Sequence, residues 1–335
     1  MFTAADIHIF ILTHNRSALL QQALQSIQAQ TLSGSPVTVL DNNSGDDTEE
    51  TVRRWADKNV RYVKTVTPHC TANLIKAQEL MDREFALILH DDDLLHPYFV
   101  QIAVDALNRY PQTALIPAQA QCFNGKGIPA EFQNAQKPQA VFHRLTSPRQ
   151  AAGEAWLPGG FIWSGSVARS SAYKKLDISA LHRQYGKILD GIILNQLSKD
   201  GNTLHPATTT VFYRLHEGQD SKQNATGVRL EQLWAWITYF HDLLAQSPDR
   251  AERRIYMLYS YKIIRGIYAF LSEDEKKRYP WKTVFVPELL KKRFLTRGMV
   301  FYAQRHKSRW GRIITLPMKV WYDRHFYKNT LVRLP

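Results

Sequence analysis

Apolar and polar residues follow two different rhythms along the first hundred residues of this chain. Short, mostly apolar runs predict buried strands at residues 7–13, 36–41, 60–65 and 85–89. Between these runs, apolar residues recur every three or four positions, which predicts helices at residues 19–27, 48–58 and 71–83. Strands that alternate with helices form a mostly parallel sheet with helices on both faces. We therefore expect a Rossmann-like α/β fold here.

The pattern is less regular in the second part of the chain. Residues 123–139 are rich in Gly, Pro, Asn and Gln, which predicts a mobile loop. Residues 173–197 predict a helix that is interrupted at Gly186, and residues 208–215 predict a further strand. From about residue 226 onward the alternation stops and Trp and Tyr become frequent, so we expect a C-terminal helical extension.

The fourth predicted strand ends in three aspartates, Asp91, Asp92 and Asp93. Adjacent carboxylates repel one another, so a fold keeps them together where a cationic partner is present. Mg²⁺ or Mn²⁺ carrying phosphates is such a partner, because these ions prefer oxygen ligands. The alternative is a solvated acidic loop that caps the next helix.

Polar clusters also follow the first and the second predicted strand, at residues 13–16 and 41–44. In a parallel sheet the carboxyl ends of the strands meet at one edge, and ligands bind there. Three polar clusters at one edge predict a ligand site more strongly than the aspartates alone.

The composition is that of a globular protein with room for a sizeable core. The chain has 335 residues, of which 44% are hydrophobic and 22% are charged. We find neither a signal peptide nor an apolar run of about 18 residues that predicts a membrane-spanning helix. Cys70 and Cys122 lack the spacing of a metal site, and we interpret them as reduced thiols of a cytoplasmic protein.

The net charge of +13 is concentrated near the C-terminal end. Residues 250–335 contain 21 Lys and Arg against 6 Asp and Glu, whereas the first 249 residues contain 22 against 24. This basic segment also carries Trp310, Trp321 and Tyr322, a combination typical of surfaces that bind anionic lipid. We expect peripheral binding to the cytoplasmic face of the inner membrane. A helical face packed on the rest of the protein, or an oligomer interface, is the alternative, and nucleic acid ranks last.

Several of these segments resemble the motifs of family 2 glycosyltransferases with the GT-A fold. The matching segments are residues 12–16 (LTHNR), 26–31 (SIQAQT), 40–46 (LDNNSGD), 72–73 (AN) and 91–93 (DDD). They occur in the family's order and at similar spacing, which makes the set more specific than any one motif. The resemblance is looser at residues 158–165, 187–191 and 213–216, and residues 228–335 match nothing.

The resemblance implies a glycosyltransferase domain at residues 1–225, with a nucleotide-binding half at 1–116 and an acceptor half at 117–225. Residues 226–335 are then a basic, aromatic-rich extension. The implied reaction is a metal-dependent, inverting transfer of a hexose or N-acetylhexosamine from a UDP-sugar to a growing, lipid-linked bacterial surface glycan. The implied cofactor is Mn²⁺ or Mg²⁺, and dTDP stays open as the nucleotide.

The resemblance also implies roles for individual residues. The metal ligands are Asp93, Asp91 and His216. The nucleotide site contains Thr13, Asn15, Arg16, Asp41, Asn43, Asn73, Asp91 and Asp92. The donor and acceptor loop contains Gly160, Ser164 and Gly165, for which a tight turn is the structural alternative.

Asp190 is the implied catalytic base, which takes the proton of the acceptor hydroxyl. Leu189 stands where the family usually has an acidic residue, and a helix N-cap is the alternative role for Asp190. Arg214 or Lys187 is a candidate cation for the phosphates. We expect structural roles for the remaining histidines near the predicted edge, which are His14, His69, His90 and His96.

Two other functions fit part of the pattern. A sugar nucleotidyltransferase shares the metal and the sheet edge, but it requires a glycine-rich, basic loop after the first strand, and residues 14–17 (HNRS) do not form one. A degenerate glycosyltransferase that only binds a nucleotide or a partner is the other alternative, and the intact aspartate triplet argues against it.

Overall fold

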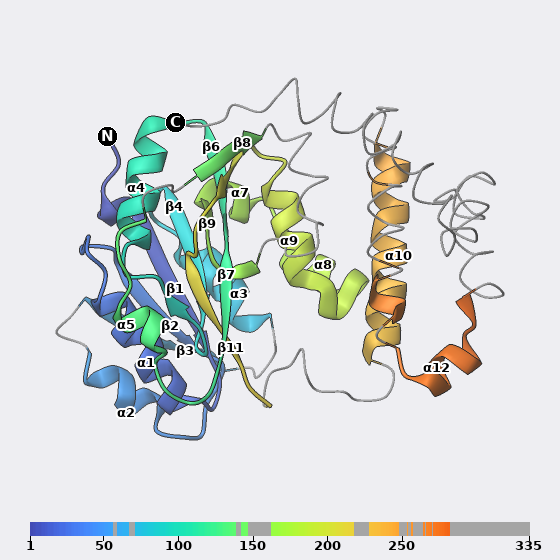
Figure 1. Ribbon diagram of the computed structural model, residues 1–335, viewed down its shortest axis with the longest axis horizontal. Helices are drawn as coiled ribbons and strands as arrows, with labels where there is room; N and C mark the ends of the chain where they lie inside the picture. The colour runs from blue at the N-terminus through green and yellow to red at the C-terminus, as the bar shows by residue number, and fades with distance from the viewer. Residues whose placement is uncertain are drawn as a thin grey trace. The chain divides into compact units, whose positions relative to one another are not determined.

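The computed structural model describes residues 1–55, 59–66, 71–138, 142–146, 162–217, 228–247, 253, 256, 264, 266–269 and 271–281 (Figure 1). These residues belong to two compact units. The first contains the described residues up to 182 together with 190–217, and the second contains 183–189 and the described residues from 228 onward.

Eight strands of the described chain form one mixed sheet in the first unit. Their order is β3 (Val60–Lys64), β2 (Val37–Asp41), β1 (Ile7–Thr13), β4 (Phe85–His90), β9 (Ile162–Arg169), β6 (Thr113–Ala118), β10 (Asn202–Pro206) and β8 (Phe142–Thr146). The first four are parallel, as predicted, whereas β9 lies antiparallel between β4 and β6 and β8 is antiparallel to β10.

The register of the parallel strands brings their polar ends to one level. Thr13 lies opposite Asp41 on β2, and Leu12 lies opposite His90 on β4. The polar segments that follow β1, β2 and β4 therefore meet at one edge of the sheet, which confirms the prediction from the sequence.

Helices cover both faces of the sheet (Figure 1). They are α1 (Ser17–Gln28), α2 (Thr48–Arg53), α3 (Ala72–Leu80), α4 (Phe99–Arg109) and α7 (Ser170–Lys174), with a short 3-10 turn at Ala4–Asp6 before β1. Along the chain, α8 (Ile178–Tyr185), a 3-10 turn at Gly186–Ile188 and α9 (Leu189–Leu197) follow α7. Buried residues of α1 and α4 form one core cluster with Ile9, Val39 and Leu87 of the strands. β1, β2 and β4 are buried almost throughout because both of their faces are covered.

A second, three-stranded sheet lies next to the polar edge. It consists of β5 (Leu94–Leu95), β11 (Val211–Leu215) and β7 (Ala120–Asn124). The prediction of a loop at residues 123–139 was wrong in part, because residues 120–124 form β7 and a short helix, α5 (Ala130–Gln133), follows. The aromatic ring of Phe132 packs edge-on against Phe212 at 5.7 Å and holds this helix to the sheet.

The interruption predicted at Gly186 is present, since this residue has a φ of +58° between α8 and α9. In the second unit, α10 (Val228–Gln246) packs on the turn at Gly186–Ile188, and the Tyr185 hydroxyl donates a 2.8 Å hydrogen bond to Asp242. α12 (Glu273–Arg278) follows. No helix among the described residues has the length and apolar character needed to span a membrane. Trp310, Trp321, Tyr322 and most of the basic segment lie outside the described residues.

Candidate active site

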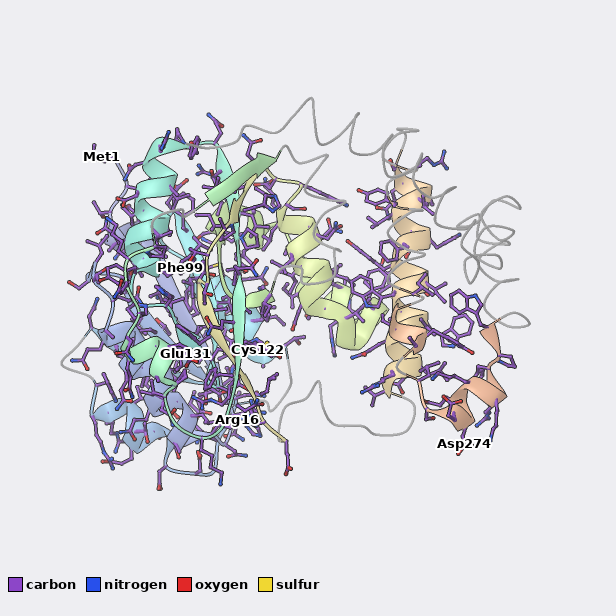
Figure 2. All side chains as sticks on the ribbon, in the orientation of Figure 1. Met1, Arg16, Phe99, Cys122, Glu131 and Asp274 are labelled. Carbon is purple, nitrogen blue, oxygen red and sulfur yellow. The ribbon has the colours of Figure 1, made fainter. Side chains whose placement is uncertain are left out.

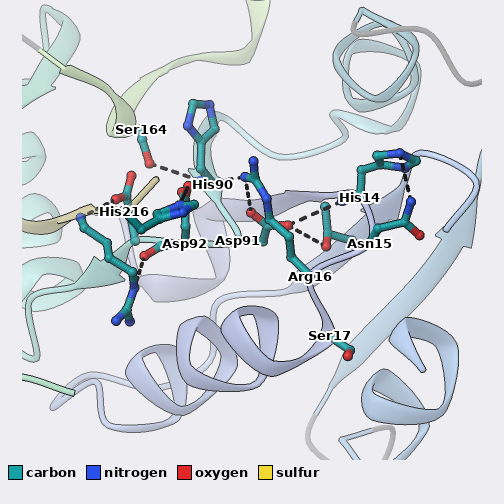
Figure 3. Close-up of polar contacts among 12 residues, drawn as sticks. His14, Asn15, Arg16, Ser17, His90, Asp91, Asp92, Ser164 and His216 are labelled. Atoms are coloured by element: carbon teal, nitrogen blue, oxygen red, sulfur yellow. Dashed lines mark hydrogen bonds and ion pairs between the residues drawn. The ribbon is translucent and has the colours of Figure 1, made fainter. Parts of the chain in front are cut away.

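The first aspartate of the triplet faces the turn that follows β1 (Figure 3). One oxygen of Asp91, Oδ2, accepts hydrogen bonds from the Thr13 hydroxyl at 2.7 Å and from the His14 amide at 3.3 Å. Its other oxygen, Oδ1, accepts a 3.3 Å bond from the Arg16 guanidinium. The side chain of Asp91 is 3% exposed. Asp91 thus ties β4 to the β1–α1 turn.

Asp92 and Asp93 contact β11, which comes from the other end of the domain. His216 lies just beyond β11, and its Nε2 is 3.0 Å from Oδ2 of Asp92. The Arg214 amide donates a 3.1 Å hydrogen bond to Oδ1 of Asp93. The structure therefore brings His216 to the triplet, as the sequence implied, with Asp92 as its partner.

A cluster of three potential metal ligands lies at this edge. One ligand atom each from His90, Asp92 and Asp93 lies within 4.8 Å of the other two. Oδ2 of Asp93 is buried and accepts no hydrogen bond within the described part of the chain. A buried carboxylate oxygen without a donor is costly unless a cation binds it. These residues therefore fit a divalent cation. The group contains Asp93, one of the ligands that the resemblance implied, together with His90 and Asp92. The other two implied ligands lie close by, with Asp91 bonded to Thr13 and His216 in contact with Asp92.

Burial and mutual repulsion disfavour the ionised form of the aspartates at this edge. Removal from water, followed by the charge of Asp92, raises the pKa of Asp93 to about 7 and that of Asp91 to about 6. Burial lowers the pKa of His90, but nearby carboxylates, Asp190 foremost, outweigh that effect and raise it. A divalent cation would compensate this charge.

Asp41, at the end of β2, is held firmly inside the protein. Its Oδ1 accepts hydrogen bonds from the Ser44 amide at 2.9 Å and the Ser44 hydroxyl at 2.5 Å. The Tyr62 hydroxyl of β3 donates a 2.6 Å bond to Oδ2. The residue is 0% exposed, so in this state the carboxylate shapes the turn after β2.

The turns after β1 and β2 are joined through asparagine side chains. Asn15 and Asn43 adopt left-handed backbone conformations, with φ of 52° and 58°. The Asn15 amide donates to the Ser44 hydroxyl at 2.8 Å, and its side-chain oxygen accepts the Gly45 amide at 2.8 Å. The side-chain amide of Asn73 bonds to the Leu40 carbonyl at 2.7 Å and to the Thr13 carbonyl at 3.3 Å. The predicted nucleotide residues thus lie together at one edge.

Side chains of α1 and of the residues just after it hold the segment that follows the triplet. The side-chain amide of Gln30 donates to the His96 carbonyl at 2.9 Å, while its oxygen accepts the Val100 amide at 3.0 Å. The Ser26 hydroxyl accepts the Leu95 amide at 3.0 Å. Ser26 and Gln30 therefore serve to position the chain that follows Asp93, a role that the sequence alone did not suggest.

Ser164 and Gly165 lie within β9, so the alternative of a tight turn was wrong. The Ser164 hydroxyl accepts the His90 amide at 3.0 Å. Gly165 has a φ of +83°, and a Cβ there would lie 3.1 Å from Cβ of Val211. A glycine at this position lets β11 approach β9 closely. Gly160 lies outside the described residues.

Arg214 is used inside the protein, although the sequence suggested a phosphate partner. The residue is 1% exposed. Its guanidinium donates to the carbonyls of Asp92, Gly125 and Gly127 and to the side-chain oxygen of Gln22, at 2.8–2.9 Å. Its plane lies over the Phe123 ring at 4.5 Å. It fixes the triplet and the β7–α5 turn to each other.

Asp190 lies in the first turn of α9, and its side chain is exposed. Its charge is the largest of the effects that raise the pKa of His90. Burial raises the pKa of Tyr173, and the charge of Asp190 adds to that increase. Asp190 is therefore within electrostatic range of His90, a member of the metal-ligand cluster.

Comparisons with known proteins agree with this architecture. Residues 8–177 match the model of glycosyl transferase family 2, which is half of the chain. No curated protein sequence matches the chain.

Among solved structures, Staphylococcus aureus TarS 1–349 in complex with UDP-GlcNAc has a TM-score of 0.59 and 14% identity, covering 79% of this chain and 73% of that one. The same TarS fragment with UDP has a TM-score of 0.58 and 14% identity, covering 81% and 77%. Against a longer TarS chain the TM-score is 0.58 at 12% identity, and the match covers 81% of this chain but only 45% of TarS. At these identities the likeness concerns the fold. The chain belongs to glycosyl transferase family 2, has the GT-A fold and is a glycosyltransferase.

Proposed function

We propose that this protein transfers a hexose or N-acetylhexosamine, with inversion and with a divalent metal, from a UDP-sugar to a growing lipid-linked bacterial surface glycan. The observation that carries the proposal is the cluster of His90, Asp92 and Asp93 at the carboxyl edge of the sheet. Such a cluster suits a nucleotide diphosphate, because the diphosphate brings a divalent ion with it. The family favours transfer over nucleotidyl chemistry.

The residues at this edge of the sheet have different roles in the proposed reaction. Mn²⁺ or Mg²⁺ bound there supplies positive charge to the departing diphosphate. Asp92, Asp93 and His90 are the proposed ligands, with His216 holding Asp92 through the 3.0 Å contact. Thr13, Asn15, Arg16, Asn43 and Asn73 line the proposed nucleotide side, and Asp41 shapes it.

Asp190 is the proposed catalytic base. As the acceptor oxygen attacks the anomeric carbon, the bond from that carbon to the diphosphate breaks and the acceptor's proton passes to the Asp190 carboxylate. Its exposed position, within electrostatic range of His90, supports this role. One displacement of this kind inverts the anomeric configuration.

The proposed donor rests on two supports. The turn after β2 is polar and is fixed by the hydrogen bonds of the buried Asp41 carboxylate, which suits a loop that recognises a base. S. aureus TarS, with a similar fold, was solved with UDP-GlcNAc and with UDP. We therefore place UDP before dTDP and test both.

A thermal-shift screen with nucleoside diphosphates tests the proposal. We expect UDP to raise the melting temperature only when Mn²⁺ is present, and Asp93→Asn to abolish the rise. Glu131→Gln, a carboxylate on α5 outside the cluster, is the control and should behave like the wild type. No shift with any nucleotide, with or without metal, contradicts the proposed donor site.

The acceptor side and the extension complete the proposal. We place the transferase domain at residues 1–225, with halves at 1–116 and 117–225, and the basic segment 250–335 on an anionic membrane surface, because its charge and aromatic content suit one. Co-sedimentation of the full chain with anionic vesicles at low salt, lost at high salt, is the expected result. Failure of the protein to sediment with the vesicles at low salt would contradict the proposed membrane binding.

A further inference from the structure

Two arginines lie against the aspartate triplet, and they differ in how far they are exposed to solvent. Arg214 is 1% exposed, and its guanidinium bonds to three carbonyls and to Gln22 at 2.8–2.9 Å. Those bonds connect the triplet, the β7–α5 turn and α1. Arg214 is therefore a fixed positive charge beside the triplet.

Arg16 is more accessible to solvent than Arg214. It comes from the β1–α1 turn, at the opposite end of β1 from Met1 (Figure 2). Its guanidinium nitrogen NH1 lies 3.3 Å from Oδ1 of Asp91 and 3.3 Å from Oδ2 of Asp92. These contacts are long for charge-assisted hydrogen bonds, and the side chain is 28% exposed. Water and other anions can therefore compete for this guanidinium.

The position of Arg16 matters because Asp92 has two possible partners. The Asp92 carboxylate belongs to the metal-ligand cluster with His90 and Asp93, and it also holds Arg16. A positive charge beside a cation site lowers the affinity for the cation by Coulomb repulsion and occupies a carboxylate that the cation needs. Asp91 remains bonded to Thr13 and the His14 amide without Arg16.

We propose that Arg16 is a built-in counter-cation that competes with the divalent metal for Asp92, so that tight metal binding depends on a nucleoside diphosphate. This inference rests on the proposed function, because it requires a diphosphate at the same edge. The phosphates offer Arg16 another anionic partner and bring negative charge to the metal. Metal and diphosphate then strengthen each other's binding, and Arg16 sets part of that coupling.

Calorimetric titration of the metal-free, full-length protein tests the inference. MnCl₂ is titrated into wild type and Arg16→Met, each with and without saturating UDP. We expect Arg16→Met to bind Mn²⁺ alone about tenfold more tightly, the order expected when one unit charge is removed near a divalent ion in a partly solvated site. The enhancement of Mn²⁺ affinity by UDP should shrink by a similar factor. Arg16→Gln, of similar length and also uncharged, should give the same result.

Two controls separate this effect from a general change of charge or fold. Arg16→Lys keeps a cation and should bind Mn²⁺ alone like the wild type. Arg53→Met removes an exposed arginine that pairs with Glu49 on α2, and it should leave Mn²⁺ binding unchanged. Arg53 takes no part in the site.

The outcomes distinguish this inference from the proposed function. If the wild type binds Mn²⁺ and UDP but Arg16→Met and Arg16→Gln bind Mn²⁺ alone no more tightly, the inference is overturned and the proposed function stands. Weaker Mn²⁺ binding by both variants also overturns it, since Arg16 would then only orient Asp92. If the wild type binds neither Mn²⁺ nor UDP, both proposals fail.

Discussion

Replacing Gly165 by alanine is the change that most directly tests how β9 and β11 shape the site. Gly165 has a φ of +83°, a conformation that residues with a side chain rarely adopt. A Cβ there would lie 3.1 Å from Cβ and 3.3 Å from Cγ2 of Val211. Both atoms belong to a residue that is 0% exposed and lies three positions before Arg214.

The expected cost follows from two effects. Forcing alanine into the left-handed region costs about 1–2 kcal/mol. Overpacking a buried contact costs about 1–3 kcal/mol, because Val211 is held in β11 between β5 and β7. Gly165→Ala should therefore lower the free energy of unfolding by about 2–5 kcal/mol, a large part of the roughly 5–15 kcal/mol of a typical domain.

Urea unfolding followed by tryptophan fluorescence measures this cost. Gly127→Ala is the matched control, since a Cβ there meets nothing within 4 Å, and it should change the stability by less than about 0.5 kcal/mol. Val211→Ala removes the methyl at 3.3 Å, so Gly165→Ala should cost less in that background than in the wild type. A cost below about 1 kcal/mol, or an equal cost in both backgrounds, would refute the steric argument.

Three further predictions concern other parts of the first unit. Gln30→Leu should destabilise the protein by about 2–4 kcal/mol in urea unfolding, because the buried Val100 amide and two or more carbonyls lose their partner; a smaller loss contradicts the role of Gln30. Asp190→Asn should reduce turnover at least about 100-fold while UDP binding, measured by calorimetry, is unchanged, and retained turnover would place the base elsewhere. Burial lowers the pKa of His8 below its ordinary 6.5. As the pH falls below 6.5, His8 is therefore protonated more readily in the unfolded chain than in the native protein, and the free energy of unfolding decreases. His8→Gln should show a smaller decrease in urea unfolding between about pH 8 and about pH 5, and equal decreases would contradict this role.

The first four strands could be predicted because their signals are local. β1 is a run of apolar residues with one buried histidine, and the polar segment after it starts at the strand's last residue, Thr13. The same holds for β2 and β4. Because the three strands are parallel, their polar ends were expected at the same edge of the sheet. The place of β9 had no such signal, because its pairing of Ser166 with Ile88 depends on residues far apart along the chain.

The candidate site could be predicted in its location but not in all of its members. Asp91, Asp92 and Asp93 look equivalent in the sequence, and only the neighbours of each carboxylate distinguish them: Thr13 beside Asp91, and His216 beside Asp92. His90 stood directly before the triplet, which was the available signal, but several other histidines lie near the same edge. The burial of Arg214 could not be predicted from the sequence, because its partners are main-chain carbonyls, which every residue has.

These contacts imply that the site belongs to the whole first unit and not to the proposed nucleotide-binding half alone. Residues 1–116 contain the triplet and His90, but Ser164, Arg214 and His216 come from the other half. Without them the His90 amide, Oδ1 of Asp93 and Oδ2 of Asp92 lose partners, and three adjacent carboxylates lose the buried charge of Arg214. Each half therefore stabilises the other at the point where the metal and the diphosphate are proposed to bind. A fragment that ends at residue 116 should consequently fail to bind Mn²⁺ with UDP even if its parallel strands form.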